Sequence, residues 1–482
     1  MQKKWAKIPE TLYQMKNQLF KWTVPDILNA VNGKLQFGTI QHPFDNISID
    51  SRSVNEKSLF VAIVGDRFDS HDFISEIIYQ PVHGVLVQED RISEEQIQLW
   101  RNKNLLCISV PDTTKALGDL GHYQRKQWAG SVVGITGTNG KTTVKELTAS
   151  VLSTTFNTIK TSGNFNNHIG VPKTLFQIQY DHKWAVVEMG MNHPGEIAYL
   201  ATICQPDIGI VTNIGPGHLE GVNSIEGVRK AKGELIQYLD HKKLAILNAD
   251  DSLVCSYQNQ CACSVLTYGL YSKADITASD ITDTIDGSQF KLRTPDGSSI
   301  IVQLPFPGRF MISNSLAAAA VGYYANIPLE SIKLALESYT PIQGRSFIRK
   351  QPNGIQIIDD TYNANPTSMR AAIDSLKQIS KGNKQYFVCG DMYELGPDGD
   401  QYHKDMGAYA AKSGLNGIFV TGNFASSVIH GAVDSGYDKN SIYTGSHSDI
   451  AQMLLKLLKP GDWVLVKGSR AMKMEQIIEM IT

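Results

Sequence analysis

Short runs of apolar, often β-branched residues recur along this chain of 482 residues, and segments of helical length lie between most of them. Continuous apolar strands that alternate with helices are typical of parallel sheets covered on both faces. The pattern therefore predicts α/β units in series. The predicted strands are Ser58–Val64, Gly84–Val87, Leu105–Val110, Ser131–Thr136, Trp184–Glu188, Ile208–Asn213, Leu244–Asn248, Ile355–Asp359, Gln385–Val388, Gly417–Val420 and Asp462–Val466.

The stretch Asp275–Val302 departs from this pattern because it is polar, β-branched and rich in turn signals such as Asp286-Gly287 and Pro295-Asp296-Gly297. Such a segment predicts antiparallel strands that leave the parallel part of the sheet.

Two positions along the chain suggest domain boundaries. The run Val110-Pro111-Asp112-Thr113-Thr114 ends a predicted strand and caps a helix expected from about Lys115 to Trp128. A second helix ends near Tyr339-Thr340-Pro341, before a new α/β block. We therefore expect three α/β domains, which comprise residues 1–110, 111–340 and 341–482.

Composition and charge narrow the class of protein. A hydrophobic fraction of 42% with 19% charged residues is ordinary for a core-forming globular chain. The formal net charge of -2 supplies no global basic field for nucleic acid or an anionic membrane, so a polyanionic ligand has to be bound locally.

Three features predict a cytoplasmic protein. The first residues, Met1-Gln-Lys-Lys-Trp5, lack an apolar targeting segment, and the soft stretch Ser315–Ala325 is too short to span a bilayer. The six cysteines are sparse, and the C-x5-C-x-C spacing within Cys255–Cys263 differs from that of zinc sites. We therefore expect no metal or redox role for them.

The strongest motif begins at Gly134, directly after the strand residues Ser131–Val133, and leads into a helix. Its glycines allow successive backbone N–H groups to face a phosphate, and the helix N-terminus adds positive potential. In this context Lys141 is expected to contact the outer phosphates and Thr142 to bind Mg²⁺. The predicted nucleotide contacts are Gly137, Thr138, Asn139, Gly140, Lys141, Thr142 and Thr143.

Several polar residues follow the next strands and helices, and each has an ordinary structural alternative. Glu188 ends one strand and His218 follows another, and ligands collect at that edge of a parallel sheet. Taken alone, either residue could be a surface or capping group. Lys232 could lie on a solvated helix, and the amides of Asn164, Asn166 and Asn167 could form a simple turn cluster.

The ordered set of motifs resembles the Mur ligase and folylpolyglutamate synthetase superfamily. The resemblance covers nearly the whole chain and includes T-G-T-x-G-K-T-T in the phosphate loop, Thr212-Asn-Ile-Gly-Pro-Gly-His218-Leu-Glu220, and Asp359-Asp360-Thr-Tyr362-Asn363-Ala-Asn365-Pro366. The loop departs from the general pattern, which needs glycine at Ile135, because its glycine stands at Gly134. At the N-terminus, Asp69-Ser70-His71 stands where the family usually has Asp-Gly-His, which puts the local loop geometry in doubt.

The resemblance implies a fold and a set of residue roles. The fold is a three-domain α/β architecture with an N-terminal UDP-substrate-binding domain, a central P-loop domain whose mostly parallel sheet carries a small antiparallel part, and a C-terminal Rossmann-like domain. Implied catalytic residues are Lys141, Glu188, His218 and Lys232; metal ligands are Thr142, Glu188, His218 and, if carbamylated, Lys232. Further implied contacts to the nucleotide are Asn314, Arg345 and Asp360 (or Asp359), and contacts to the other substrates are Ser51, Arg52, Ser53, Asn164, Asn166, Asn167, Asn363, Asn365, Lys467 and Ser469.

The resemblance also implies an activity. Y-N-A-N-P-x-S-M and Cys389-Gly-Asp391-Met392-Tyr-Glu394-Leu-Gly396 are characteristic of the family members that join D-alanyl-D-alanine to UDP-N-acetylmuramoyl-tripeptide. They do so with ATP and Mg²⁺ through an acyl phosphate, for peptidoglycan synthesis. We expect a monomer that binds no nucleic acid and does not insert into a membrane.

Two other classes of function stay open at this stage. A sister ligase of the same superfamily would use another amino acid or a folate. A nucleotide-dependent switch would bind a protein partner, but it would leave Ser51-Arg52-Ser53 unexplained.

Overall fold

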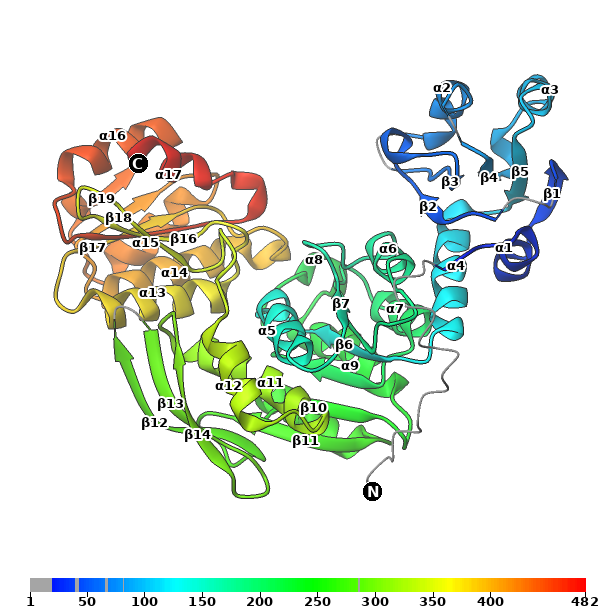
Figure 1. Cartoon of the computed structure of the whole chain (residues 1–482). Coiled ribbons are helices and arrows are strands. Elements are labelled where there is room, and N and C mark those ends of the chain that lie inside the picture. The colour runs from blue at the N-terminus through cyan, green and yellow to red at the C-terminus, as the bar shows by residue number, and fades with distance from the viewer. Residues whose placement is uncertain (1–19, 40–42, 66–67, 81, 285–286) are drawn as a thin grey trace. The chain divides into compact units, whose positions relative to one another are not determined.

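The computed structural model describes residues 20–39, 43–65, 68–80, 82–284 and 287–482 and contains three β-sheets flanked by helices (Figure 1). The sheets have five, nine and six strands in sequence order, which confirms the predicted three-part α/β fold. The first residues, Met1–Trp5, and the predicted turn residue Asp286 lie outside the described residues. The chain divides into two compact units, residues 1–134, 155–190 and 196–208 and residues 135–154, 191–195 and 209–482.

The five-stranded sheet has the order β1-β5-β4-β3-β2, with β1 antiparallel to β5 and the other pairs parallel. Leu59 and Val61 pack with α1 and α4 on one face, whereas Phe60 packs with α2 and α3 on the other. This period of two explains why the strand is apolar throughout. The elements are α1 (Val24–Val31), β1 (Lys34–Phe37), β2 (Asn46–Ser48), β3 (Ser58–Val61), α2 (Ile74–Ile77), β4 (Gly84–Gln88), α3 (Glu94–Asn102), β5 (Leu106–Val110) and α4 (Thr113–Gln127).

The nine-stranded sheet has the order β14-β13-β12-β11-β10-β9-β6-β8-β7. Strands β10, β11 and β12 are parallel neighbours, and β12, β13 and β14 are antiparallel, as the segment Asp275–Val302 predicted. The strands are β6 (Ser131–Thr136), β7 (Thr158–Lys160), β8 (Trp184–Glu188), β9 (Ile208–Val211), β10 (Leu244–Asn248), β11 (Ser264–Gly269), β12 (Ile276–Thr284), β13 (Gly287–Arg293) and β14 (Ser299–Leu304). The helices are α5 (Lys141–Ser153), α6 (Gly170–Phe176), α7 (Glu196–Cys204), α8 (Leu219–Val222), α9 (Ile225–Tyr238), α10 (Ser252–Cys255), α11 (Arg309–Tyr324) and α12 (Leu329–Glu337).

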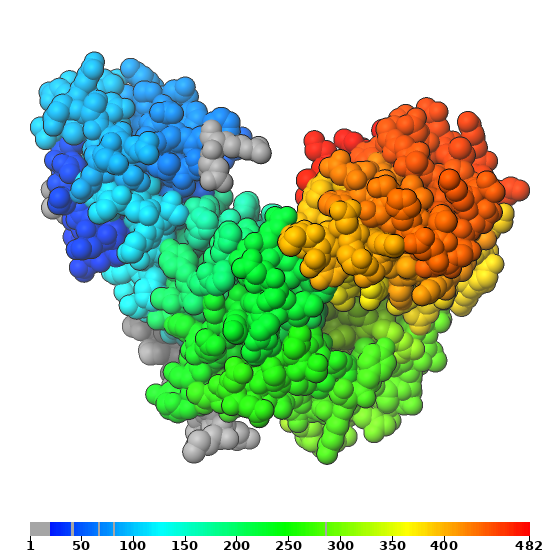
Figure 2. All heavy atoms as spheres, turned by 180° about the vertical axis from the view of Figure 1, so that it is seen from behind, coloured from blue at the N-terminus to red at the C-terminus, as the bar shows by residue number. Residues whose placement is uncertain are grey.

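The six-stranded sheet has the order β15-β16-β20-β17-β18-β19, and only the edge strand β15 is antiparallel to its neighbour. Helices α16 and α17 cover one face and α13, α14 and α15 cover the other (Figure 1). Figure 2 shows these residues, coloured yellow to red, gathered in one compact mass. The elements are β15 (Phe347–Lys350), β16 (Gln356–Asp360), α13 (Pro366–Ser380), β17 (Gln385–Cys389), α14 (Gly399–Lys412), β18 (Gly417–Val420), α15 (Ala425–Asp434), β19 (Ile442–Thr444), α16 (His447–Leu457), β20 (Trp463–Lys467) and α17 (Glu475–Ile481).

The predicted helix after the first sheet begins two residues earlier than expected, at Thr113. Within the run predicted to cap this helix, the cap is the Asp112 side chain, because its Oδ1 accepts the N–H groups of Thr114 and Lys115 at 2.8 and 2.9 Å. Among the described residues no helix is both long and apolar enough to cross a membrane.

Arg125, near the C-terminus of α4, is a buried cation that binds several backbone carbonyl groups. Its guanidinium donates to the carbonyl oxygens of Cys204, Trp128 and Gln205 at 2.8, 3.1 and 3.2 Å, and it lies 3.3 Å from Asp207 Oδ2. A fork of five donors suits such convergent acceptors, whereas no apolar side chain can satisfy them.

We predict that Arg125→Met destabilises the chain by about 2–4 kcal/mol, because buried carbonyl groups lose their donor. The measurement is the urea midpoint of unfolding followed by tryptophan fluorescence. Arg91→Met is the control, since Arg91 is exposed and has an ion pair of 3.4 Å with Asp69. Equal midpoints for the two variants would contradict a structural role for Arg125.

Candidate functional site

The phosphate loop, residues Gly134–Thr143, joins β6 to α5 in a conformation that its glycines allow. Gly137 has φ 146°, and a Cβ atom there would lie 1.8 Å from Thr212 Oγ1. Gly140 has φ 81° and precedes the first residue of α5. Only glycine accepts both the left-handed backbone and the close approach of Thr212. The loop therefore places its backbone at a helix N-terminus, as an anion-binding turn requires.

A second loop, residues Thr212–His218, is hydrogen-bonded to the phosphate loop; we call it the histidine loop. Thr212 Oγ1 and Asn213 Nδ2 donate to the carbonyl of Asn139 at 2.6 and 3.0 Å. Asn213 Oδ1 accepts the N–H of Asn139 at 2.9 Å, and the carbonyl of Asn213 accepts the N–H of Thr138 at the same distance. The two loops thus behave as one polar network, which gives Thr212 and Asn213 a structural reason to be polar.

The side chains predicted to hold the nucleotide lie along this network. Lys141 Nζ donates to the carbonyls of Gly137 and Thr138 at 2.8 and 3.3 Å. The ammonium therefore lies over the loop. Thr142, in the first turn of α5, is buried. Asn314 of α11 lies against the loop, because a Cβ atom on Gly140 would be 2.6 Å from Asn314 Oδ1.

Lys232 lies on α9 and is fully buried. Burial, together with the nearby positive charge of Lys141, lowers the pKa of Lys232 well below its ordinary value. A neutral amine is the nucleophilic form of lysine, and a carbamate formed on it would be an anion close to the Lys141 ammonium. The location agrees chemically with the role that the family resemblance implies.

The His218 ring lies against Glu394, with Nδ1 2.6 Å from Glu394 Oε2, although the two groups are not aligned as a hydrogen bond. The close contact with His218 lowers the pKa of the Glu394 carboxyl. Both residues have positive φ angles, 58° and 64°.

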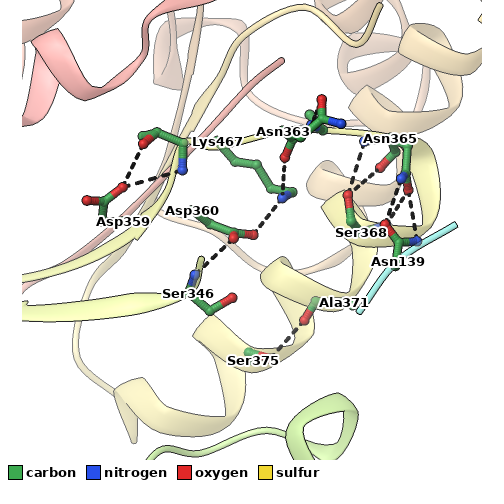
Figure 3. A network of polar contacts seen from close by, with 12 residues as sticks. Asn139, Ser346, Asp359, Asp360, Asn363, Asn365, Ser368, Ala371, Ser375 and Lys467 are labelled. Atoms are coloured by element: carbon green, nitrogen blue, oxygen red, sulfur yellow. Dashed lines mark hydrogen bonds and ion pairs between the residues drawn. The ribbon is translucent and has the colours of Figure 1, made fainter. Parts of the chain in front are cut away.

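The two aspartates at the end of β16, Asp359 and Asp360, have different environments. Asp359 is fully buried, and its Oδ2 lies 2.6 Å from the Arg349 guanidinium, so it belongs to the interior of the sheet. Asp360 accepts the N–H of Ser346 at 2.9 Å and pairs with Lys467 Nζ at 2.6 Å (Figure 3). Lys467 also donates to the carbonyl of Asn363 at 2.8 Å. Of the two aspartates, Asp360 is therefore the one with a carboxylate at the sheet edge, and Lys467 holds it there.

Asn365 connects the C-terminal part to the phosphate loop. Its Nδ2 donates to Asn139 Oδ1 at 2.7 Å, and Asn139 Nδ2 donates back to Asn365 Oδ1 at 3.3 Å (Figure 3). The same Asn365 Oδ1 caps α13 by accepting the N–H of Ser368 at 2.9 Å. The guanidinium of Arg345 lies 4.0 Å from the centroid of the Tyr362 ring. Ser469 is buried, and its Oγ accepts the N–H of Tyr393 at 2.9 Å.

In the other compact unit, Glu188 ends β8 and is buried. Its Oε1 accepts Nδ2 of Asn166 at 2.9 Å. Asn167 Oδ1 accepts the N–H groups of Ile169 and Gly170, so this amide shapes the start of α6. Asn164 is exposed.

The Ser51–Ser53 segment forms a single 3₁₀ turn. Arg52 is exposed, and its guanidinium makes a two-point contact with Asp50 at 2.8 and 2.9 Å. Ser53 Oγ lies 2.9 Å from Ser48 Oγ. The Arg52 charge is thus presented at the surface, where an anionic substrate could replace Asp50 as its partner.

The donors suit Mg²⁺ held by a nucleotide rather than by a protein cage. Within the described ranges no group of three or more His, Cys, Asp or Glu side chains could enclose a metal ion. Mg²⁺ in phosphate-transfer sites usually takes only one or two protein ligands and completes its shell with phosphate and water. The hydroxyl of Thr142, at the end of the phosphate loop, and the carboxylate of Glu188 are both hard oxygen donors, which Mg²⁺ prefers.

Three contacts of the site were absent from the sequence interpretation: His218 with Glu394, Asn139 with Asn365, and Lys467 with Asp360. Each joins residues more than 100 positions apart, so no local spacing could reveal them. The sequence motif that contains Glu394 indicates the class of ligase but does not predict the contact of Glu394 with His218.

Two domain families match the chain. The model of the Mur ligase middle domain matches residues 135–322, and that of the Mur ligase glutamate ligase domain matches residues 344–470. The UDP-N-acetylmuramoyl-tripeptide–D-alanyl-D-alanine ligase of Escherichia coli (strain K12) is 35% identical over 463 residues, which cover 95% of this chain and 98% of that protein.

Two solved structures are similar over most of their length. A crystal structure of MurF from Acinetobacter baumannii has a TM-score of 0.88 at 32% identity and covers 96% of this chain and 99% of its own. MurF ligase from Thermotoga maritima in complex with ADP has a TM-score of 0.80 at 26% identity and covers 90% and 96% of the two chains. On its sequence, its three sheets and these relatives, the chain belongs to the Mur ligase family.

Proposed function

We propose that this chain joins D-alanyl-D-alanine to UDP-N-acetylmuramoyl-tripeptide with cleavage of ATP to ADP and phosphate. Relatives named UDP-N-acetylmuramoyl-tripeptide–D-alanyl-D-alanine ligase match nearly the whole length of the chain, and one solved neighbour is a complex with ADP. The observation that carries the proposal is the phosphate loop at the N-terminus of α5, with Lys141 over it and the histidine loop bonded to it. The product is the precursor with a pentapeptide, for peptidoglycan synthesis.

In the proposed reaction, the terminal carboxylate of the tripeptide attacks the γ-phosphorus of ATP and ADP leaves. The amine of D-alanyl-D-alanine then attacks the acyl phosphate, an amide bond forms, and phosphate leaves with the loss of a proton from the amine. Little covalent chemistry falls to the protein, so positioning and charge neutralisation dominate. Backbone N–H groups at the start of α5, from Gly140 to Thr142, and the Lys141 ammonium would bind the phosphates, because the N–H groups of Thr138 and Asn139 already donate to Asn213.

Mg²⁺ bound by Thr142 and Glu188, and a second ion at His218 and carbamylated Lys232, would neutralise charge between the carboxylate and the phosphates. Asn314, Arg345 and Asp360 would bind the nucleotide, with the last held in place by Lys467. Ser51, Arg52, Ser53, Asn164, Asn166 and Asn167 would bind the UDP-tripeptide. Asn363, Asn365 and Ser469 would shape the site from the C-terminal part.

We assign residues 1–110 to binding of the UDP-linked substrate, residues 111–340 to ATP and residues 341–482 to closure over the site. Exclusion of water would protect the acyl phosphate from hydrolysis. All six cysteines are unpaired, which supports a cytoplasmic location.

The proposal is tested with purified chain, ATP, Mg²⁺ and UDP-N-acetylmuramoyl-tripeptide. D-Alanyl-D-alanine, diaminopimelate, lysine or glutamate is offered as the amine, and ADP release and product mass are measured. Only D-alanyl-D-alanine should give a joined product. Product with another amine would indicate a sister ligase, and ATP hydrolysis indifferent to the muramoyl peptide would indicate a switch.

We predict that Lys141→Met lowers product formation at least ~100-fold while the fold survives, because the charge that offsets the phosphates is lost. The rate is followed by ADP release and the fold by circular dichroism. The exposed Lys242 provides the control variant, Lys242→Met, which should keep the wild-type rate. A normal rate for Lys141→Met would remove the phosphate-loop assignment.

Lys232 is predicted to react with CO2, so that its amine nitrogen bonds to carbon and releases one proton. Protein equilibrated with ¹³C-bicarbonate should give a carbamate signal in the ¹³C spectrum that is missing in Lys232→Ala. Lys230→Ala is the matched control, because Lys230 is exposed two residues away on the same helix. A signal that persists in Lys232→Ala would place the carbamate elsewhere, and no signal in the wild type would refute it.

Lys467→Met is predicted to raise the KM for ATP about tenfold, because Asp360 loses the ammonium that holds it and one good charged hydrogen bond is worth about that factor. The KM for the dipeptide should change little. Lys456→Met, at an exposed position of α16, controls for loss of charge. If the KM for the dipeptide rises instead, Lys467 acts on that substrate, as the sequence interpretation had it.

A further inference from the structure

The contact between His218 and Glu394 joins the histidine loop after β9 to the Asp391–Gly396 loop after β17. The two residues are 176 positions apart, and their side-chain atoms are 2.6 Å apart. Both have a left-handed backbone, which costs free energy for a residue with a Cβ atom and therefore persists only where surrounding contacts enforce it. The two loops thus hold both partners in conformations that isolated chains disfavour.

The residues before Glu394 are anchored one by one. The buried Asp391 carboxylate accepts the N–H groups of Asn423 and Phe424 at 2.8 and 3.1 Å. The N–H of Met392 donates to Nε2 of the buried His403 at 2.9 Å. The N–H of Tyr393 donates to Ser469 at the same distance.

His403 is itself fixed, since its Nδ1 donates to the carbonyl of Gly399 at 2.7 Å and its ring stacks on Phe424. The backbone that presents Glu394 is therefore rigid up to the residue before it. By contrast, the Glu394 carboxylate extends out of this framework and meets His218 of the histidine loop. These hydrogen bonds fix the position of the Glu394 backbone relative to the histidine loop.

We propose that Glu394 is the positioning residue for His218: when His218 ligates a metal through Nε2, its ring turns to place the Nδ1 proton on the Glu394 carboxylate 2.6 Å away, which fixes the ring orientation and leaves the lone pair on Nε2. This inference rests on the proposed function, in which His218 is a metal ligand. Histidine ligands commonly donate their other nitrogen to a carboxylate, which fixes the tautomer and makes the ligating nitrogen more basic.

Two other roles for Glu394 make different predictions. A simple latch between loops would act on stability and not depend on His218. An anchor for the ammonium group of D-alanyl-D-alanine would act on the KM for the dipeptide.

The test combines four variants of the full chain: Glu394→Ala, Glu394→Gln, His218→Ala and the double variant His218→Ala/Glu394→Ala. Glu479→Ala is the control, because Glu479 is an exposed glutamate on α17 of the same sheet. Two quantities are measured for each: the steady-state kcat with the KM for the dipeptide, and the affinity for Mn²⁺ with ADP present, by electron paramagnetic resonance. Thermal melting checks that each variant is folded.

Glu394→Ala should lower kcat and Mn²⁺ affinity each about 10–100-fold, the usual effect of removing the partner of a ligating histidine, and leave the KM for the dipeptide within about twofold. Glu394→Gln should recover most of both, since its amide oxygen accepts the same proton. In the His218→Ala background the second substitution should add nothing, as expected for two residues that act as one unit.

Three results would overturn the inference: losses that add in the double variant, a raised KM for the dipeptide, or a glutamine variant no better than alanine. A Glu394→Ala chain that melts early would shift the decision to Glu394→Gln and to the Mn²⁺ cycle in chains that remain folded. The Mn²⁺ measurement needs no turnover. If the wild-type chain forms no product, the proposed function fails while the coupling between Glu394 and His218 is still decided.

Discussion

The structure of the site depends on one constraint, which is that the phosphate loop must bend sharply into α5 while its backbone polar groups keep hydrogen-bond partners. Gly137 and Gly140 allow the required backbone, and Thr212 approaches where a side chain on Gly137 would stand. The carbonyl of Asn139 then faces outward and needs donors, which Thr212 and Asn213 supply. The shape of the phosphate loop therefore requires polar residues at the start of the histidine loop.

The same hydrogen-bond network also fixes the positions of His218 and Asn365. The histidine loop that satisfies Asn139 ends at His218, so the contacts that hold the phosphate loop also place the histidine. The side chain of Asn139 pairs with Asn365, which caps α13. A change in the conformation of the phosphate loop would thus act directly on the C-terminal part, because Asn139 belongs to the loop and its side chain contacts Asn365.

Much of the fold could be predicted from sequence because the central strands are buried on both faces and read as unbroken apolar runs. Ser131–Thr136, Trp184–Glu188, Leu244–Asn248 and Gly417–Val420 have the predicted bounds. Short strands such as β2, β7 and β19 were missed, since three residues carry no measurable period. The strand β15 was missed because it pairs along an edge and is only partly buried.

The site shows a similar division for a physical reason. Positions fixed by local backbone chemistry, such as the glycines and Lys141, can be identified from spacing, because the turn itself demands them. Pairings between distant loops depend on tertiary packing, and a sequence reveals only the residue types. Asp359 and Asp360 illustrate the limit: adjacent, identical and ambiguous in sequence, they point to opposite faces of a strand, so that one pairs with Arg349 in the interior and the other reaches Lys467 at the edge. The alternation of a β-strand, not the motif, therefore decides which carboxylate is available to a ligand.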